Sequence, residues 1–290
     1  MIRYSISLYD LVNRINALKP TWIKRAYERT QLYITAKDFT GGTDFWGEIK
    51  SIYIELQHEK CAYCETKLQG AMLASKVHEV EHYRPKQSVA AWPNNNISYW
   101  AGFKPSWPVG QESKTGYYKL AYHPLNYAIA CTRCNSTLKS NYFPVRGKRK
   151  TAGDHPSKML AELPLLVYPI SSVDPDDPAD LITFQGVLAV PKHSSGAAYE
   201  RAITNIEFFQ LNHEDLTSRR AQEISKLWMA LEEVSNPRSK KSGEKAKKIA
   251  ANICSPSSQF TSCMNAFRKL YQNNYVEAEQ IADLIIDALR

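Results

Sequence analysis

"NYAIACTRCNSTLK", residues 126–139, is the most informative segment of this chain. It contains a pair of cysteines, Cys131 and Cys134, separated by two residues, and a matching pair, Cys61 and Cys64, occurs upstream. A two-residue gap lets two thiolates of one tight turn bind a single tetrahedral ion, with Zn–S bonds of about 2.3 Å. The four cysteines therefore predict a closed, structural zinc site.

The two cysteine pairs lie much farther apart than the spacing of about 15–20 residues in local zinc ribbons. The zinc is therefore expected to clamp the two ends of a sizeable module, placed at residues 58–150. The alternatives are four unrelated core cysteines or redox pairs. The two remaining cysteines, Cys254 and Cys263, are isolated, and we interpret them as buried structural thiols.

"VHEVEHYRPK", residues 77–86, lies between the two pairs and allows two interpretations. His78-Glu79-Val80-Glu81-His82 matches H-E-x-x-H, in which a helix turns both histidines toward one catalytic zinc. Pro85 follows closely and disfavours helical geometry at Arg84. A zinc metalloprotease is therefore the less favoured interpretation.

The second interpretation rests on the order of several motifs. "VEHYRPK" is followed by Asn126, by the second cysteine pair with Asn135, and by Lys139. This order resembles the HNH nuclease family. With Cys61-Ala-Tyr-Cys64-Glu65 and Phe143-Pro144 also in place, the chain is most similar to the retron-associated and Septu-type anti-phage HNH nucleases. The resemblance covers roughly residues 20–220.

The resemblance implies a ββα-metal (His-Me finger) core, in which two strands and a helix surround one catalytic ion. His82 is the expected general base, because an imidazole accepts a proton near neutral pH. Glu81 and Asn135 offer hard oxygen ligands for Mg²⁺ or Mn²⁺. Asn126 is expected to brace the loop that carries the histidine, since a carboxamide both donates and accepts hydrogen bonds. His123 is a weaker candidate for contact with the site.

Two geometric conditions follow. Adjacent residues of a regular strand point to opposite faces, so Glu81 and His82 share a site only if the strand ends or bulges there. Asn135 and Lys139 share a face if residues 132–140 are helical.

Nucleic-acid contacts are expected from basic residues around the motifs and from the basic loop "RGKRK", residues 146–150. A solubilising loop is the alternative for residues 146–150. The predicted phosphate contacts are Arg84, Lys86, Lys139, Arg146, Lys148, Arg149 and Lys150.

The rest of the chain favours an α+β protein that is mostly helical. Residues 1–57 form a helical N-terminal segment, and residues 151–290 a mainly helical region with a hairpin around Gln185-Gly186 and a possible partner-docking surface. Residues 87–120 form a long ordered insertion. Its aromatic residues are expected in the core or at a partner, rather than stacked on bases: Trp92, Tyr99, Trp100, Phe103 and Trp107.

Composition is compatible with these expectations. The chain has 290 residues and a formal net charge of +8, which suits a polyanionic partner. It has no long apolar run or export signal, so a cytoplasmic protein without membrane contact is expected. The resemblance implies DNA as the substrate, a role in bacterial anti-phage defence and an ABC/SMC-type ATPase partner that gates the nuclease. A non-catalytic, zinc-stapled binding module is the alternative.

Overall fold

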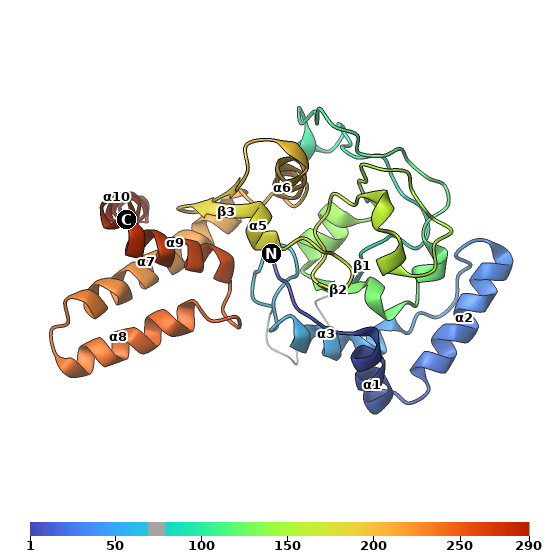
Figure 1. Cartoon of the computed structure of the whole chain (residues 1–290), viewed down its shortest axis with the longest axis horizontal. Coiled ribbons are helices and arrows are strands. Elements are labelled where there is room, and N and C mark those ends of the chain that lie inside the picture. Colours follow the sequence, from blue (N-terminus) through green and yellow to red (C-terminus); the bar gives the residue numbers. More distant parts are fainter. Residues whose placement is uncertain (69–78, 290) are drawn as a thin grey trace.

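The computed structural model describes residues 1–68 and 79–289, which form a mixed α/β structure that is about half helical (Figure 1). The α-helices are α1 (Leu8–Leu18), α2 (Trp22–Ala36), α3 (Lys50–Leu56), α5 (Pro178–Leu181), α6 (Gly196–Phe208), α7 (Glu214–Ser235), α8 (Lys240–Ile253), α9 (Thr261–Asn273) and α10 (Tyr275–Ala288). The strands are β1 (Glu79–His82), β2 (Tyr127–Ala130), β3 (Ile182–Gln185) and β4 (Leu188–Pro191).

The predicted N-terminal helices are present. In α1, Leu11 and Ile15 are four residues apart and both are buried, so they share one face. The Ser7 side chain caps α1 by accepting a hydrogen bond from the Asp10 N–H at 3.0 Å. In α2, the buried ring of Trp22 packs against the ring of Tyr127, the first residue of β2. A short 3₁₀ turn, η1 (Trp46–Ile49), leads into α3, which packs against β2.

β1 and β2 pair antiparallel, with His82 opposite Tyr127. All four residues of β2 are buried, whereas β1 runs from an exposed Glu79 to a buried His82. β1 ends at His82. The Tyr83 N–H still donates to the Asn126 carbonyl, but the Arg84 N–H donates to the Asn126 side chain. The geometric condition for Glu81 and His82 to share a site, that the strand ends there, is therefore met.

The second cysteine pair leads into η5 (Arg133–Lys139), which is a π-helix. The Ser140 N–H donates to the Asn135 carbonyl, five residues earlier, at 2.7 Å. Residues 132–139 are thus helical, but Asn135 and Lys139 do not share one environment. Lys139 is fully buried and turns inward to a buried carboxylate, while Asn135 stays near the surface.

A long connection, residues 83–126, joins β1 to β2 with three short 3₁₀ turns and little other regular structure. Two of its aromatic residues, Trp92 and Trp100, are buried and pack against Phe208 of α6, with ring centroids 5.3 and 5.5 Å apart. The core interpretation is therefore confirmed for these two residues. Tyr99, by contrast, is 43% exposed.

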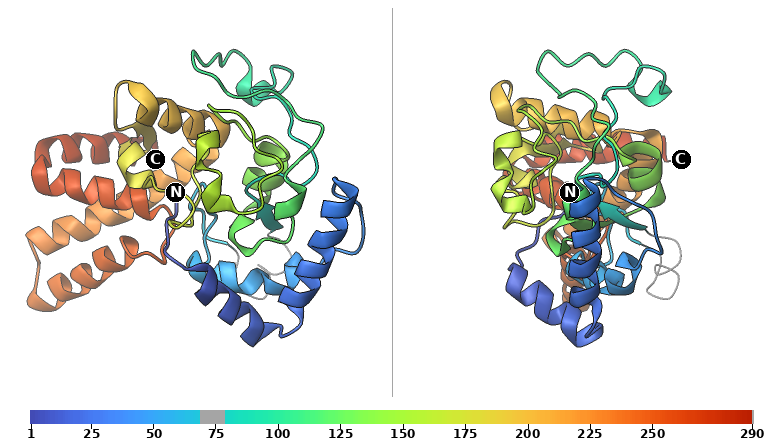
Figure 2. Two further views of the ribbon diagram at one scale, coloured as in Figure 1. Left: turned by 45° about the vertical axis from the view of Figure 1, so that its right-hand side comes forward. Right: turned by 90° about the vertical axis from the view of Figure 1, so that its right-hand side faces the viewer.

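The C-terminal region contains the predicted hairpin, in which β3 and β4 pair around a turn at Gly186 and Val187. Gly186 has a positive φ of 55°, a conformation that glycine adopts without strain. α7 packs against α8, α9 and α10, and these four helices lie at the opposite end of the molecule from α2 (Figures 1 and 2). Cys254 and Cys263 are buried, as expected. Within the described residues, no helix is both long and apolar enough to cross a membrane.

The helical end is attached to the first cysteine turn through Glu65. Its buried carboxylate accepts hydrogen bonds from the Ser262 N–H, at 3.0 Å, and from the Ser262 hydroxyl at the start of α9. The Lys60 ammonium also donates to the Thr261 hydroxyl at 2.9 Å. Buried residues from all parts of the chain form one continuous core. The division of the chain into the three predicted regions, 1–57, 58–150 and 151–290, stays a prediction.

Candidate metal and catalytic sites

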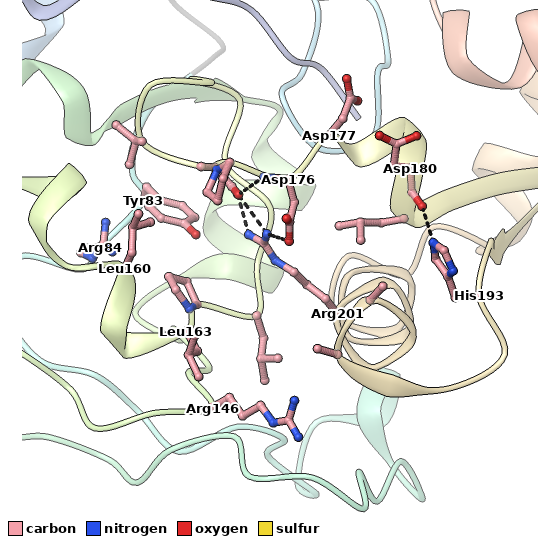
Figure 3. A pocket seen from close by; sticks show the side chains of 18 residues that line it. Tyr83, Arg84, Arg146, Leu160, Leu163, Asp176, Asp177, Asp180, His193 and Arg201 are labelled. Carbon is pink, nitrogen blue, oxygen red and sulfur yellow. Dashed lines mark hydrogen bonds and ion pairs between the residues drawn. The ribbon is translucent and has the colours of Figure 1, made fainter.

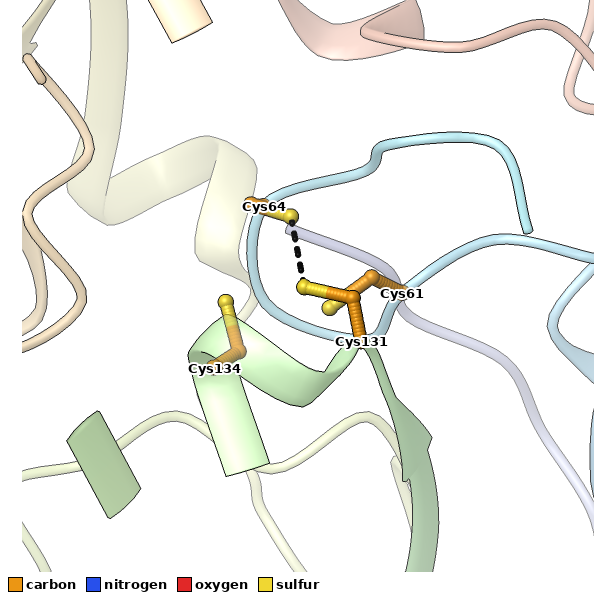
Figure 4. A group of neighbouring side chains, drawn as sticks. All are labelled: Cys61, Cys64, Cys131 and Cys134. Atoms are coloured by element: carbon orange, nitrogen blue, oxygen red, sulfur yellow. Dashed lines mark hydrogen bonds between the residues drawn. The ribbon is translucent and has the colours of Figure 1, made fainter. Parts of the chain in front are cut away.

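The four paired cysteines come together in one cluster, with all four Sγ atoms within 4.8 Å of one another (Figure 4). Cys61 and Cys64 belong to one loop, Cys131 follows β2, and Cys134 lies on η5. The Sγ atoms of Cys64 and Cys131 are 3.8 Å apart, which is close to the separation of roughly 3.8 Å that tetrahedral Zn–S bonds of about 2.3 Å require. The cluster therefore fits a structural metal ion such as zinc.

A cavity of about 750 Å³ lies beside β1 and collects most of the predicted catalytic residues. It receives side chains from η1, β1 and η5 and from the loop that follows β1. Its lining consists of Trp46, Gly47, Lys50, Glu79, Val80, Glu81, His82, Pro85, Lys86, Gln87, Ser88, Asn135, Ser140 and Asn141.

The imidazole ring of His82 is held in place by contacts on several sides. Its Nε2 lies 3.0 Å from the Ala121 carbonyl oxygen, which also accepts the Tyr127 hydroxyl at 2.6 Å. The Trp46 ring stands edge-on to the imidazole with centroids 4.7 Å apart. Burial lowers the pKa of His82 well below its usual range, and the nearby Lys86 acts in the same direction. The ring is therefore neutral at pH 7.

Glu81 is 3% exposed and pairs with the fully buried Lys139, with Nζ and Oε1 3.0 Å apart. Burial raises the pKa of the Glu81 carboxyl to about 7, although the Lys139 ammonium opposes this change. Burial also lowers the pKa of Lys139. Both charges are thus costly in this environment, and each is retained through the other.

Asn126 is fully buried and holds the backbone just after His82 from both sides. Its Oδ1 accepts the Arg84 N–H at 2.9 Å, and its Nδ2 donates to the Arg84 carbonyl at 3.0 Å. The same Nδ2 reaches the Leu120 carbonyl at 3.2 Å. These contacts are the geometry that a bracing asparagine requires.

Glu79 is a site residue to which the sequence analysis assigns no role. Its Oε2 accepts hydrogen bonds from Asn135 Nδ2 and from the Ser136 hydroxyl, the latter at 2.7 Å. An ionised carboxylate only accepts, so the amide nitrogen of Asn135 must face Glu79. The Asn135 Oδ1 is then turned away from Glu79. The sequence gives only a partial signal, because Glu79 and Glu81 lie two apart on a strand and share a face. It does not show the contact of Glu79 with Asn135.

Two of the predicted phosphate contacts are corrected by their surroundings. Arg84 is 1% exposed and pairs with Glu162 at 2.9 Å, and Lys139 is paired with Glu81, so neither can reach a phosphate at the surface. Arg149 donates to the carbonyls of Gln111 and Phe143, and the exposed Arg146 pairs with Glu200 at 3.2 Å. Phosphate binding by these two arginines stays a prediction.

Of the other three, Lys86 lines the cavity, with Nζ 4.7 Å from the Trp46 ring centroid. Lys148 and Lys150 are exposed. Phosphate binding by these three lysines stays a prediction.

The zinc metalloprotease interpretation is wrong. That motif requires a helix through both histidines, but Glu79–His82 is a β-strand, and His78 lies outside the described residues. His123 also lies apart from the cavity of His82. It lines a separate groove between α1 and α2, and its Nδ1 accepts the Leu125 N–H at 3.1 Å.

A second cavity, of about 610 Å³, lies beside α5 and α6 (Figure 3). Arg201 lines this cavity and donates to Asp174 at 2.9 Å and to Asp176 at 2.6 Å (Figure 3). Its guanidinium also reaches the Leu166 carbonyl, at 2.9 Å. These ion pairs join α6 to the 166–176 segment, so we assign this cavity a structural network and no chemistry.

Comparison with known proteins finds two relatives. The chain is 27% identical over 176 residues to Septu protein PtuB of Bacillus mycoides (strain KBAB4), covering 60% of this chain and 50% of that protein. It is 30% identical over 142 residues to Septu protein PtuB of Bacillus thuringiensis, covering 47% of this chain and 51% of that protein. The chain therefore spans about half the length of these relatives. No family model and no solved structure matches. The chain is thus a homologue of proteins named Septu protein PtuB.

Proposed function

We propose that this chain is a metal-dependent HNH endonuclease that hydrolyses phosphodiester bonds of DNA. The observation that supports this best is the arrangement of His82. A carbonyl oxygen only accepts, so the contact with Ala121 places the proton on Nε2 and leaves Nδ1 as the proton acceptor. With its pKa lowered by burial, the ring is in the form that a general base requires.

In this proposal β1, β2 and η5 form the ββα-metal core. Glu81 and Asn135 would hold Mg²⁺ or Mn²⁺, because both line the cavity of His82 and carry the hard oxygens that these ions prefer. A bound divalent ion supplies charge neutralisation at the phosphate and the leaving oxygen. Glu81 must then be shared with or released from Lys139.

The other residues of the cavity position the reacting groups. His82 Nδ1 would take a proton from water as the water oxygen bonds to phosphorus and the bond to the leaving oxygen breaks. Asn126 fixes the backbone after His82, and the Trp46 ring limits the tilt of the imidazole. Lys86 offers positive charge to a phosphate in the same cavity.

The biological role is part of the proposal. The similarity to proteins named Septu protein PtuB and the motif resemblance support an effector of bacterial anti-phage defence. We place its activity under the control of an ABC/SMC-type ATPase partner, because a weakly specific nuclease without control would cut the DNA of its own cell. A cleavage rate that the partner leaves unchanged would contradict this control.

The alternative, a non-catalytic zinc-stapled binding module, is favoured by one observation. The Glu81–Lys139 ion pair occupies the carboxylate that the metal requires. A cleavage assay with Mg²⁺ and Mn²⁺, on DNA and RNA and with and without the partner ATPase, decides between the two functions.

The deciding variant is His82→Ala, with His193→Ala as a control because His193 is exposed and far in sequence from the cavity. We expect His82→Ala to slow cleavage by about 10²- to 10⁴-fold, the usual contribution of a general base. Zinc content and DNA binding are expected to stay unchanged. Cleavage by His82→Ala at the parent rate would contradict the assigned base, and a parent protein that binds DNA without cutting it would support the binding module.

A further inference from the structure

α8 has two opposite faces of different chemistry. Gly243, Ala246 and Ala250 are buried and follow one another at helical spacing, so they form the face that packs on α7. A Cβ at Gly243 would lie 3.0 Å from Pro237, which shows how closely α8 approaches the preceding turn. The residues of the opposite face are exposed.

Three lysines occupy the outward face. Lys241, Lys245 and Lys248 are spaced i, i+4 and i+7, so they lie in one row along the helix, and all three are exposed. We call these three residues the α8 lysine row. With a rise of 1.5 Å per residue, the row extends over about 10 Å.

Within the described part of the chain, no ion pair compensates the charge of the row. The neighbouring acidic residues pair with other cations, Glu244 with Lys247 at 3.3 Å and Glu233 with Arg238 at 2.9 Å. Over residues 1–68 and 79–289, no carboxylate lies within ion-pair distance of the row. The three ammonium groups therefore remain available to an external anion.

The position of these charges works against the stability of the helix. The first turn of α8 contains Lys240 and Lys241 and no acidic residue, although the positive end of the helix dipole disfavours cations there. Like charges four residues apart, as in Lys241 and Lys245, destabilise the helix further. A face needed only for solubility would be served better by mixed charges.

We propose that the α8 lysine row binds the phosphate backbone of a nucleic acid, as a second contact surface outside the catalytic cavity. The inference rests on the proposed function, which takes DNA as the substrate. About 10 Å matches roughly three successive phosphates of one strand, at 3.4 Å each along the duplex axis. A lysine ammonium is a point charge without the planar fork that reads bases, so this contact is independent of sequence.

A membrane surface does not suit this helix. Membrane-surface helices insert an exposed apolar face below the lipid headgroups, but the small-residue face of α8 is already covered by α7. An acidic protein partner remains the other polyanion, and the experiment separates it from nucleic acid.

The test is the salt dependence of binding to a fluorescent 30-base-pair duplex, measured by anisotropy with the zinc-loaded full chain and no other divalent metal. The variant is K241Q/K245Q/K248Q. The control K19Q/K24Q/K37Q removes the same charge from exposed lysines of the N-terminal region. Each phosphate contact contributes about 0.9 to the slope of log K against log salt. We therefore expect the row variant to reduce that slope by about 2 to 3, and the control to reduce it by less than about 1.

The outcomes separate this inference from the proposed function. If the slope falls as expected and the parent never cuts DNA, the row binds nucleic acid and the nuclease proposal fails. If the row variant keeps the parent slope and affinity, or the parent does not bind the duplex, the inference is overturned whatever the cleavage result. Loss of binding to an acidic protein with DNA binding unchanged also overturns it. In a parent that cuts, the row variant should raise KM and leave kcat unchanged.

Discussion

Glu79 and Glu81 lie two residues apart on β1, yet their carboxylates have different partners. Glu81 is buried against Lys139, while Glu79 stays exposed and accepts from Asn135 and Ser136. In the proposed catalytic site, where Asn135 would hold the metal ion, Glu79 would be the outer residue that orients this ligand. Loss of such a partner typically weakens metal binding by about 10- to 100-fold.

We expect Glu79→Ala to weaken Mn²⁺ binding about 10- to 100-fold, because the Asn135 amide loses the group that orients it. Glu79→Gln still offers a carbonyl acceptor and should stay within about threefold of the parent. Mn²⁺ affinity of the zinc-loaded chain, measured by calorimetry, gives both values.

The double variant shows whether Glu79 acts through Asn135. Glu79→Ala/Asn135→Ala is expected to bind Mn²⁺ no more weakly than Asn135→Ala alone, because residues that act as one unit are not additive. Additive losses would show that Glu79 contributes independently of Asn135, and a low affinity of Glu79→Gln would show that its charge matters.

His123 predicts a measurable acid sensitivity. Burial lowers its pKa to about 3, with His155 acting in the same direction and Asp154 opposing it. The unfolded chain takes up the proton below pH 6.5 or so, while the folded chain does not until about pH 3, so stability decreases as the pH falls through this interval. At pH 5 the cost is about 2 kcal/mol.

In His123→Asn, an amide oxygen replaces Nδ1 as the acceptor for the Leu125 N–H, and the titrating group is gone. Between pH 7.5 and pH 5, the unfolding free energy of the parent should decrease. We expect that of His123→Asn to decrease by about 2 kcal/mol less. Urea unfolding at both pH values measures the difference. His193→Asn, at an exposed position, is the control. If it reduces the pH dependence of the unfolding free energy by the same amount, His123 is not the source of that dependence.

At the scale of elements, the cysteine cluster joins three segments of the chain. The 61–64 turn, the end of β2 and the start of η5 meet at the four Sγ atoms. Structural zinc contributes about 10–16 kcal/mol in small zinc peptides, as much as the whole stability of a typical domain. The β1–β2–η5 unit is therefore expected to depend on the metal.

Cys134→Ser should lower the zinc content and expose the backbone of β2 and η5 to solvent. The expected result is loss of amide protection across residues 127–139 in hydrogen exchange, together with a lower Tm. Cys263→Ala is the control, because Cys263 is buried but lies on α9, outside the cluster. Full amide protection in a zinc-free Cys134→Ser protein would refute the dependence.

At the scale of the whole molecule, elements defined by local patterns were predictable. Leu11 and Ile15 have helical spacing, and Gly186 indicates the hairpin turn. The cysteine cluster was predictable because the spacing within each pair already specifies a shared ion. The π-helical form of η5 was not, since its sequence has the same apolar spacing that an α-helix would have.

Partners that are distant in the sequence were the part that could not be predicted. Arg84 and Lys139 read as surface cations until the fold places Glu162 and Glu81 beside them in the interior. Glu79 was passed over because its role depends on Asn135, which only the pairing of β1 with β2 brings near. A charged residue in the sequence indicates a possible contact. Its burial in the fold decides whether that contact is with an external phosphate or with an internal partner.

The separation of the two cysteine pairs also has a kinetic consequence. Each pair alone supplies two ligands, and the closed four-sulfur cluster forms only once the 61–64 turn has met the end of β2 and the start of η5, which are distant in the sequence. Zinc held by a single pair would exchange quickly with the solvent. Once all four sulfurs are engaged and mostly buried, the ion can leave only when this unit opens. The residence time of the zinc therefore reports the lifetime of the folded unit.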